Sequence, residues 1–126
     1  MRLLLDSHVA LWWLAGDSNV GPETAAMIHA ADTVYFSPVT PWELGIKRSL
    51  GKIDFPDGLV LELVAAGLEE QPITSAHAET AAALHPHHRD PFDRMLIAQA
   101  TIESLSLITA DTMLDAYDIP IINARS

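Results

Sequence analysis

Short apolar runs alternate with longer segments of helical periodicity along this chain. Apolar, β-branched or aromatic runs predict strands at 2–5, 33–36, 69–73, 105–108 and 119–122, of which the 69–73 strand is the weakest. Helical periodicity, in several places bounded by proline or glycine, predicts helices at 7–16, 22–31, 40–51, 56–67, 75–84, 90–104 and 111–117. Strands that alternate with helices indicate an α/β fold with a parallel sheet covered on both faces.

The most apolar of these strands are 2–5 and 105–108, so we expect them to lie side by side at the centre of the sheet. No repeat, linker or low-complexity tract divides the chain, and 126 residues suit one domain spanning 1–126. Ligands of open parallel sheets bind beyond the carboxyl ends of the strands, where the strand order reverses. We therefore look for functional residues directly after the central strands.

Composition restricts the class of protein. The chain has no cysteine, so it forms neither disulfides nor thiolate metal sites, and no apolar segment is long enough for a signal peptide or a membrane span. We expect a soluble cytoplasmic protein without a membrane partner. The net charge of −10 by itself disfavours nucleic acid as a partner. Five of the seven lysines and arginines nevertheless fall in two clusters, Lys47, Arg48 and Lys52, and Arg89 and Arg94.

Several carboxylates occupy positions where helix capping is a sufficient explanation. Asp6 and Asp111 follow the two central strands and precede helices, as N-caps do. Thr40 and Glu43 have the spacing of a capping box. Asp90 precedes Pro91 in "HHRDPFDRML" and is a natural N-cap, which leaves Asp93 at the third helical position. For any one of these residues alone, capping is the more common role.

Taken together, four acids predict a site. The carboxyl ends of the central strands and the N-termini of the returning helices lie at the same edge of a parallel sheet, so Asp6, Glu43, Asp93 and Asp111 should converge there. Asp93 and Glu43 also head apolar stripes, and a charge on a core-facing stripe needs a partner. Mg²⁺ takes carboxylate oxygens, and two such ions about 3.5–4 Å apart can activate a water and stabilise the leaving oxygen of a phosphodiester.

Four segments, "LLLDSHVALWWL", "SPVTPWELGIKRSLGKI", "DPFDRMLIAQA" and "LITADTML", resemble the PIN-domain ribonucleases, and specifically toxins of the VapC type. The resemblance covers essentially the whole chain. It implies a five-stranded parallel sheet of order 3-2-1-4-5, RNA cleavage that depends on Mg²⁺ or Mn²⁺, a homodimer, and a small VapB-type antitoxin as partner. Carried over by motif, Asp6, Glu43, Asp93 and Asp111 are the metal-site acids, and Ser7 stands where the family has a small hydroxyl residue.

From these residues we predict an endoribonuclease in which Lys47, Arg48, Lys52, Arg89 and Arg94 flank the acids and grip RNA phosphates. A basic antitoxin segment would occupy the acidic cleft, while apolar surface of the early helices docks its hydrophobic side chains. Asp90 would cap its helix and Asp93 would bind the metal. Two alternatives stay open: an interaction module whose acids only cap helices, and a metal-dependent nuclease that acts on DNA or other structured nucleic acid.

Particular residues argue against several other classes of protein. Neither phosphate-cradling glycine motif is present. A haloacid-dehalogenase-like phosphatase would have an aspartate where His8 stands, and a receiver domain would have a lysine beyond Lys52, the last in the chain. The spacing of His85, His87 and His88 is poor for zinc. We expect those three in a solvated loop, the histidines His8, His29 and His77 on helix surfaces, and the tryptophans Trp12, Trp13 and Trp42 in the core or an interface.

Overall fold

The computed structural model describes residues 1–86, 90–111, 114 and 117–126. His87, His88 and Arg89, and most of the helix expected at 111–117, lie outside the described residues. Five parallel strands form one sheet of order β3-β2-β1-β4-β5, which confirms the predicted order. Their bounds are β1 Arg2–Leu5, β2 Thr33–Phe36, β3 Glu69–Glu70, β4 Ser106–Thr109 and β5 Ile121–Asn123.

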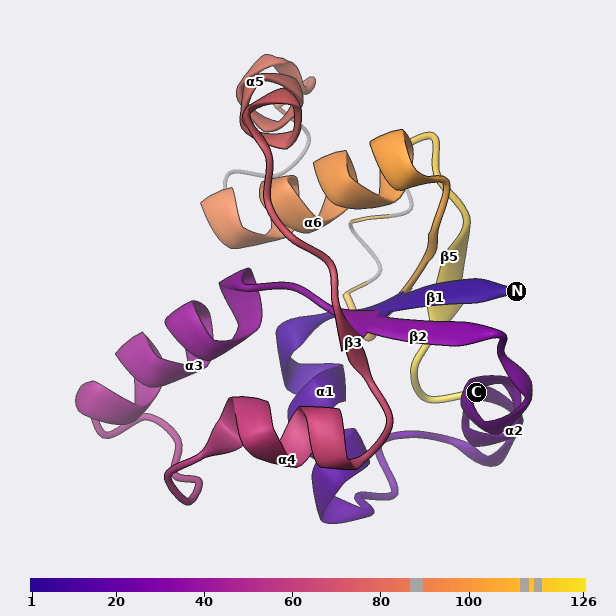
Figure 1. Ribbon diagram of the computed structural model, residues 1–126, viewed down its shortest axis with the longest axis vertical. Coiled ribbons are helices and arrows are strands. Elements are labelled where there is room, and N and C mark those ends of the chain that lie inside the picture. The colour runs from indigo at the N-terminus through magenta and orange to yellow at the C-terminus, as the bar shows by residue number, and fades with distance from the viewer. Residues whose placement is uncertain (87–89, 112–113, 115–116) are drawn as a thin grey trace.

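Helices cover both faces of the sheet (Figure 1). They are α1 Ser7–Ala15, α2 Pro22–Ala30, α3 Val39–Ser49, α4 Leu59–Ala65, α5 Ser75–Ala83 and α6 Pro91–Glu103. Successive side chains of β1 point to opposite faces of the sheet and so contribute to two separate layers of the core. Leu4 packs with Leu96 and Ile97 of α6 on one face, and Leu3 and Leu5 pack with α1, α2 and α4 on the other. The three leucines of β1, Leu3, Leu4 and Leu5, are therefore fully buried, as expected for the centre of a parallel sheet.

The consecutive helices α5 and α6 form a hairpin that is held by polar contacts at both ends. At one end the Arg94 guanidinium of α6 donates to carbonyl oxygens at the end of α5, those of Ala81, Ala82, Leu84 and His85. A cation at these carbonyls satisfies acceptors that a helix terminus otherwise leaves unpaired. The clamp next to Arg94 fixes the first turn of α6, which carries Asp93.

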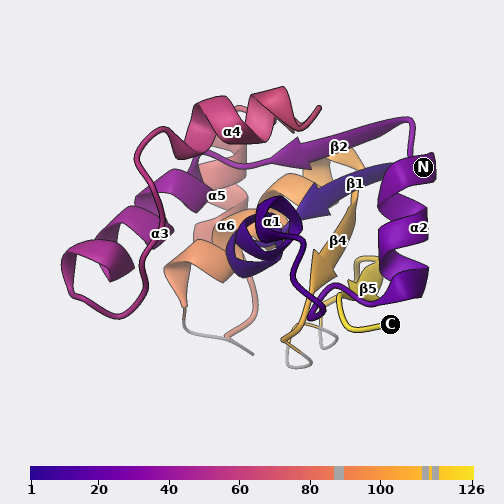
Figure 2. The same cartoon turned by 90° about the horizontal axis from the view of Figure 1, so that it is seen from below.

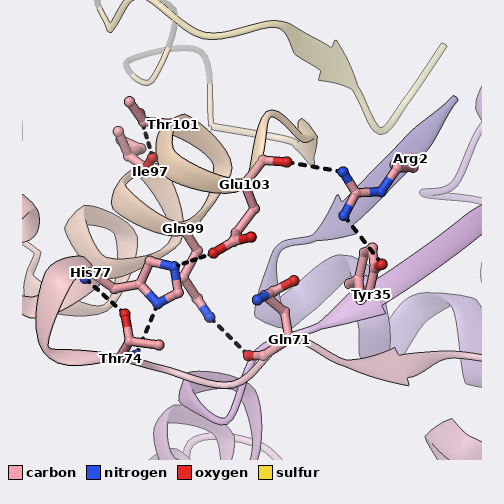
Figure 3. A network of polar contacts seen from close by, with 9 residues as sticks. All are labelled: Arg2, Tyr35, Gln71, Thr74, His77, Ile97, Gln99, Thr101 and Glu103. Atoms are coloured by element: carbon pink, nitrogen blue, oxygen red, sulfur yellow. Dashed lines mark hydrogen bonds and ion pairs between the residues drawn. The ribbon is translucent and has the colours of Figure 1, made fainter.

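The other end of the hairpin is closed by the polar contacts of His77 (Figure 3). This residue is fully buried. Its Nδ1 accepts from the Thr74 backbone N–H at 2.9 Å, which leaves the proton on Nε2. Nε2 donates to Glu103 at 3.0 Å, and the Glu103 carbonyl accepts from Arg2 of β1. The expectation that His77 lies on a helix surface is therefore wrong, because its ring closes a capping box and bridges two helices.

The start of α3 also differs from the expectation. Thr40 is not an N-cap, and the Thr40–Glu43 capping box does not form, because the helix begins at Val39 and Thr40 lies inside it. The N-cap position is Pro38, which has no side-chain cap, and the Ser37 hydroxyl before it accepts from the Val39 N–H at 3.1 Å. The stripe predicted below Glu43 is wrong as well. Ile46 and Leu50 are exposed, and the buried face of α3 carries Leu44 instead.

Residues 123–126 are held against the start of α2 (Figure 1). Gly21 donates its N–H to the Ala124 carbonyl at 2.8 Å, and Glu23 donates to the Ser126 carbonyl at 2.9 Å. A Cβ at Gly21 would lie 2.3 Å from the backbone of Ser126, so only glycine allows this approach. The contact fixes the backbone on either side of Arg125.

Candidate active site at the carboxyl edge of the sheet

A cavity of about 310 Å³ opens at the carboxyl ends of the central strands. In Figure 2 the arrowheads of β1 and β2 point to the side of the molecule where α1 and α3 lie. Five carboxylates line this space together with one lysine, and we call it the acidic cavity. Its lining residues are Asp6, His8, Val9, Trp12, Glu43, Lys47, Asp90, Asp93, Ala110 and Asp111.

Asp6 sits between the end of β1 and the start of α1. One carboxylate oxygen accepts from the His8 N–H at 2.9 Å, so the predicted N-cap is confirmed. The other accepts from the Thr109 hydroxyl at 2.6 Å. Burial raises the pKa of Asp6, and the charge of Glu43 adds to this; the hydrogen bonds from Thr109 and His8 act in the opposite direction. The net direction is upward, so the anionic form of Asp6 lacks sufficient positive charge around it.

Thr109 links two of the acids and was not among the residues singled out from the sequence. Its hydroxyl donates to Asp6 and accepts from the Asp111 backbone N–H at 3.0 Å. Thr109 is the last residue of β4 and is buried. A hydroxyl residue that ends a central strand two positions before an acid is the signal that would have found it.

Glu43 reaches the acidic cavity from the second turn of α3, with only 5% of its surface exposed. Its Oε2 accepts from the Lys47 ammonium at 2.7 Å, one turn further along the helix. Beside it, the hydroxyls of Ser7 and Thr40 share a buried hydrogen bond of 3.2 Å. Lys47 therefore balances a carboxylate whose burial would otherwise be costly.

Asp90 and Asp93 come from the start of α6. Asp90 accepts from the N–H groups of Phe92 at 2.8 Å and Asp93 at 3.3 Å, so the predicted N-cap is confirmed. Asp93 heads the stripe of Leu96, Ile97 and Ala100, all buried, as the spacing predicted. Both carboxylates line the acidic cavity, Asp90 from the N-cap position and Asp93 from the first turn of the helix.

The structure separates the predicted RNA-binding cations. Lys47 is the one lysine or arginine among the described residues that line the acidic cavity. Arg48 turns away, because its guanidinium pairs with Asp57 at 3.0 Å and lies over the Phe55 ring. Lys52 is exposed on the loop beyond α3, and the Arg94 guanidinium donates to carbonyl oxygens at the end of α5. Arg89 lies outside the described residues.

The chemistry of these donors suits a hard divalent cation, because carboxylate oxygens are the ligands such ions prefer. In the described part of the chain, no three histidine or acid side chains are already close enough together to hold one ion. Glu43 is turned to Lys47, and Asp6 to Thr109 and His8. An ion would therefore require the carboxylates to turn toward one another.

Comparison with known proteins gives the family. The model of the PIN domain matches residues 3–120. The chain belongs to the PIN-domain family. Ribonuclease VapC22 from Mycobacterium tuberculosis is 30% identical to this PIN domain over 121 residues, 94% of the chain and 93% of the relative. The likeness identifies the PIN domain as one of the VapC type.

Solved structures share the fold of this PIN domain. VapBC2 from Rickettsia felis bound to a promoter DNA fragment has a TM-score of 0.72 at 13% identity, covering 98% of both chains. VapBC-5 from Mycobacterium tuberculosis has a TM-score of 0.63 at 22% identity, covering 97% of this chain and 98% of the other. At these identities the likeness concerns the fold. Among the described residues, no helix is long and apolar enough to cross a bilayer.

The raised pKa of Asp6 predicts a stability change. The folded chain holds this proton more tightly than the unfolded chain, so ionisation of Asp6 costs folding free energy as the pH rises. Asp6→Asn removes that cost while an amide oxygen still caps α1. We expect the metal-free variant to be more stable than the parent at pH 7. The difference should shrink as the pH falls through the raised pKa of folded Asp6, and it should be gone below about 3.9, the ordinary Asp value.

Urea unfolding in chelator across the pH range measures this difference. Asp57→Asn is the control, because Asp57 is an exposed carboxylate paired with Arg48, and its loss should not stabilise the chain. A lower stability of Asp6→Asn at neutral pH, with the difference persisting in acid, would contradict the account of Asp6.

Proposed function

We propose that this PIN domain is a metal-dependent endoribonuclease, the toxin of a VapBC-type pair, which hydrolyses RNA phosphodiester bonds with a metal-activated water. The observation that carries the proposal is the convergence of five carboxylates, from three helices and the end of β4, on one cavity with a single lysine. Capping accounts for Asp6 and Asp90 but not for Glu43 and Asp93, which lie inside their helices and line the same cavity. The likeness to Ribonuclease VapC22 supports RNA as the substrate.

In this proposal Asp6 and Asp111 hold the main ion, Asp93 supports it, and Glu43 holds a second ion or orients the attacking water. Mg²⁺ or Mn²⁺ bound there would activate water and stabilise the leaving oxygen. Thr109 fixes the Asp6 carboxylate and the backbone of Asp111 relative to each other. The buried hydroxyls of Ser7 and Thr40 keep α1 and α3 in contact beneath the acids.

Lys47 has a role of its own in the proposal. It forms an ion pair with Glu43 in the absence of other cations, and its side chain is one-third exposed, so it can also reach outward. When another cation neutralises Glu43, the ammonium becomes available to a phosphate oxygen of the RNA. A protein of net charge −10 needs such a local reversal of charge to accept a polyanion.

A VapB-type antitoxin is the proposed protein partner, because the solved neighbours VapBC2 and VapBC-5 are toxin–antitoxin complexes. The proposal also includes a homodimer. Exposed apolar side chains on α3 and α4 offer a surface for such contacts: Trp42, Ile46, Leu50, Val60, Leu61 and Val64. Clustered apolar exposure of this kind is typical of protein interfaces.

The first prediction on function compares two aspartates of one turn. Asp93→Asn should lower RNA cleavage by more than the roughly 10- to 100-fold that follows loss of a residue supporting a ligand. Asp90→Asn should leave cleavage nearly unchanged, because asparagine caps a helix as well as aspartate does. Single-turnover cleavage of RNA in Mg²⁺ or Mn²⁺ measures both.

Four controls complete this experiment. Asp6→Asn and excess EDTA should each abolish cleavage, and thermal melts should show that every variant is folded. Matched DNA of the same sequence tests the rival substrate, and equal rates on both would favour the general nuclease. Full activity in EDTA would refute the metal mechanism, and an inert parent protein would favour the non-catalytic interaction module. If Asp90→Asn were inactive and Asp93→Asn active, Asp90 would be the metal ligand and not Asp93.

The second prediction separates Lys47 from Arg48. Lys47→Gln should weaken RNA binding and reduce the slope of log K against log salt by about one, as expected when one phosphate contact is lost. Arg48→Gln should change neither, because Arg48 pairs with Asp57 away from the acidic cavity. Binding titrations with RNA at several salt concentrations distinguish them. Equal effects of the two changes would contradict the proposed path of the RNA.

The third prediction concerns the antitoxin. Arginine presents a planar fork that matches carboxylates, so a basic antitoxin segment can fill the acidic cavity and compete with metal. The complex should be inactive, and rising Mn²⁺ should restore cleavage before the two proteins dissociate. Activity and complex size, measured on the same samples, test this. A fully active complex, or inhibition indifferent to Mn²⁺, would refute blocking of the cavity.

A further inference from the structure

Two aromatic rings line one side of the acidic cavity, where the acids and Lys47 do not explain their presence. His8 and Trp12 lie one turn apart on α1, with ring centroids 6.3 Å apart and planes inclined at 52°. Both side chains are half-buried, so part of each ring stays open. The expectation that His8 is merely a helix-surface residue is therefore incomplete, because its ring forms part of the cavity wall.

A cation lies over the Trp12 ring. The Arg125 guanidinium carbon lies 5.8 Å from the centroid of the Trp12 ring. The backbone around Arg125 is anchored, because Ala124 and Ser126 accept hydrogen bonds from Gly21 and Glu23. His8, Trp12 and Arg125 thus form a continuous strip, which we call the aromatic rim. It runs from the acids out to the surface.

The other tryptophans do not share this position. Trp13, next along α1, makes an edge contact with His29 at 4.9 Å, and it is absent from the lining of the acidic cavity. Trp42 is 62% exposed and makes an edge contact with Phe92. Trp12 is therefore the one tryptophan that borders the acids.

We infer that the aromatic rim is a nucleobase subsite, an inference that rests on the proposed function. The base of an RNA nucleotide beside the scissile phosphate stacks against Trp12 and His8, and Arg125 faces the next phosphate outward. Stacking suits this protein, because a base has no charge to be repelled by the carboxylates or by the net charge of −10. Aromatic rings bind single-stranded nucleic acid in this way, with little dependence on sequence.

A scan with abasic nucleotides tests the subsite. Oligoribonucleotides that lack one base at successive positions around the cleavage site are cleaved in Mn²⁺. One position should lower kcat/KM by roughly 5- to 150-fold, the range for a lost base–aromatic stack. Trp12→Ala should lower kcat/KM for the complete RNA by a similar factor. In that variant the abasic substitution at the same position should cost nothing further.

Two comparisons separate stacking from a general loss of structure. Trp12→Phe keeps a ring and should retain sensitivity to the missing base, whereas Trp13→Phe, the neighbouring control, should behave as the parent protein does. Arg125→Gln changes an exposed side chain. It should weaken binding modestly and reduce the salt slope by about one.

A fluorescence measurement of RNA binding tests the nucleobase subsite independently of cleavage. RNA carrying 2-aminopurine at the sensitive position, or at each position in turn if nothing is cleaved, should lose fluorescence on binding the parent protein and keep it with Trp12→Ala. Absence of cleavage with quenching that depends on Trp12 would overturn the nuclease and retain the subsite. If RNA is cleaved but no abasic position lowers kcat/KM, the subsite is overturned and the nuclease retained. The same holds if the losses in kcat/KM from Trp12→Ala and from the missing base multiply.

Discussion

Leu5 of β1 lies opposite Ile108 of β4, and the Asp6 N–H donates to the Ile108 carbonyl at 3.0 Å. This parallel register decides where everything else at the cavity can be. It brings Asp6 against Thr109 and places Asp111 just beyond. Because the strands are parallel, the helices that return to this edge begin here too, and α6 presents Asp93. A slip of one residue would turn the side chains of β1 to the opposite faces of the sheet, and the packing of both core layers would be lost.

The acidic cavity is a compromise between charge and burial. Asp6 takes hydrogen bonds from a hydroxyl and a backbone N–H, and Glu43 takes an ammonium, so only Glu43 has a neighbour of opposite charge. The raised pKa of Asp6 shows that this compensation is incomplete. The same imbalance that disfavours the metal-free site would favour a cation, whether an ion or an arginine from a partner.

Local sequence patterns predicted part of the fold and of the acidic cavity. Apolar runs gave the central strands, and proline after Asp90 marked the start of α6. The start of α3 was mispredicted because the Thr40 hydroxyl is taken by Ser7, 33 positions away. Thr109 was missed, and Arg94 was expected to bind RNA and not α5, for a similar reason: the partners of both side chains lie on other elements. Side chains whose role is to join distant segments leave no periodic pattern.

The bond between Thr109 and Asp6 joins residues 103 positions apart in the chain. Contacts of such long separation cost loop-closure entropy before they return any stability, and they form late in folding. A ribosome that has made α1, α3 and α4 has therefore produced most of the core on one face but no cavity. The acids meet only after β4 is synthesised and inserted beside β1. A nascent chain would thus lack the assembled acidic cavity until synthesis is nearly complete.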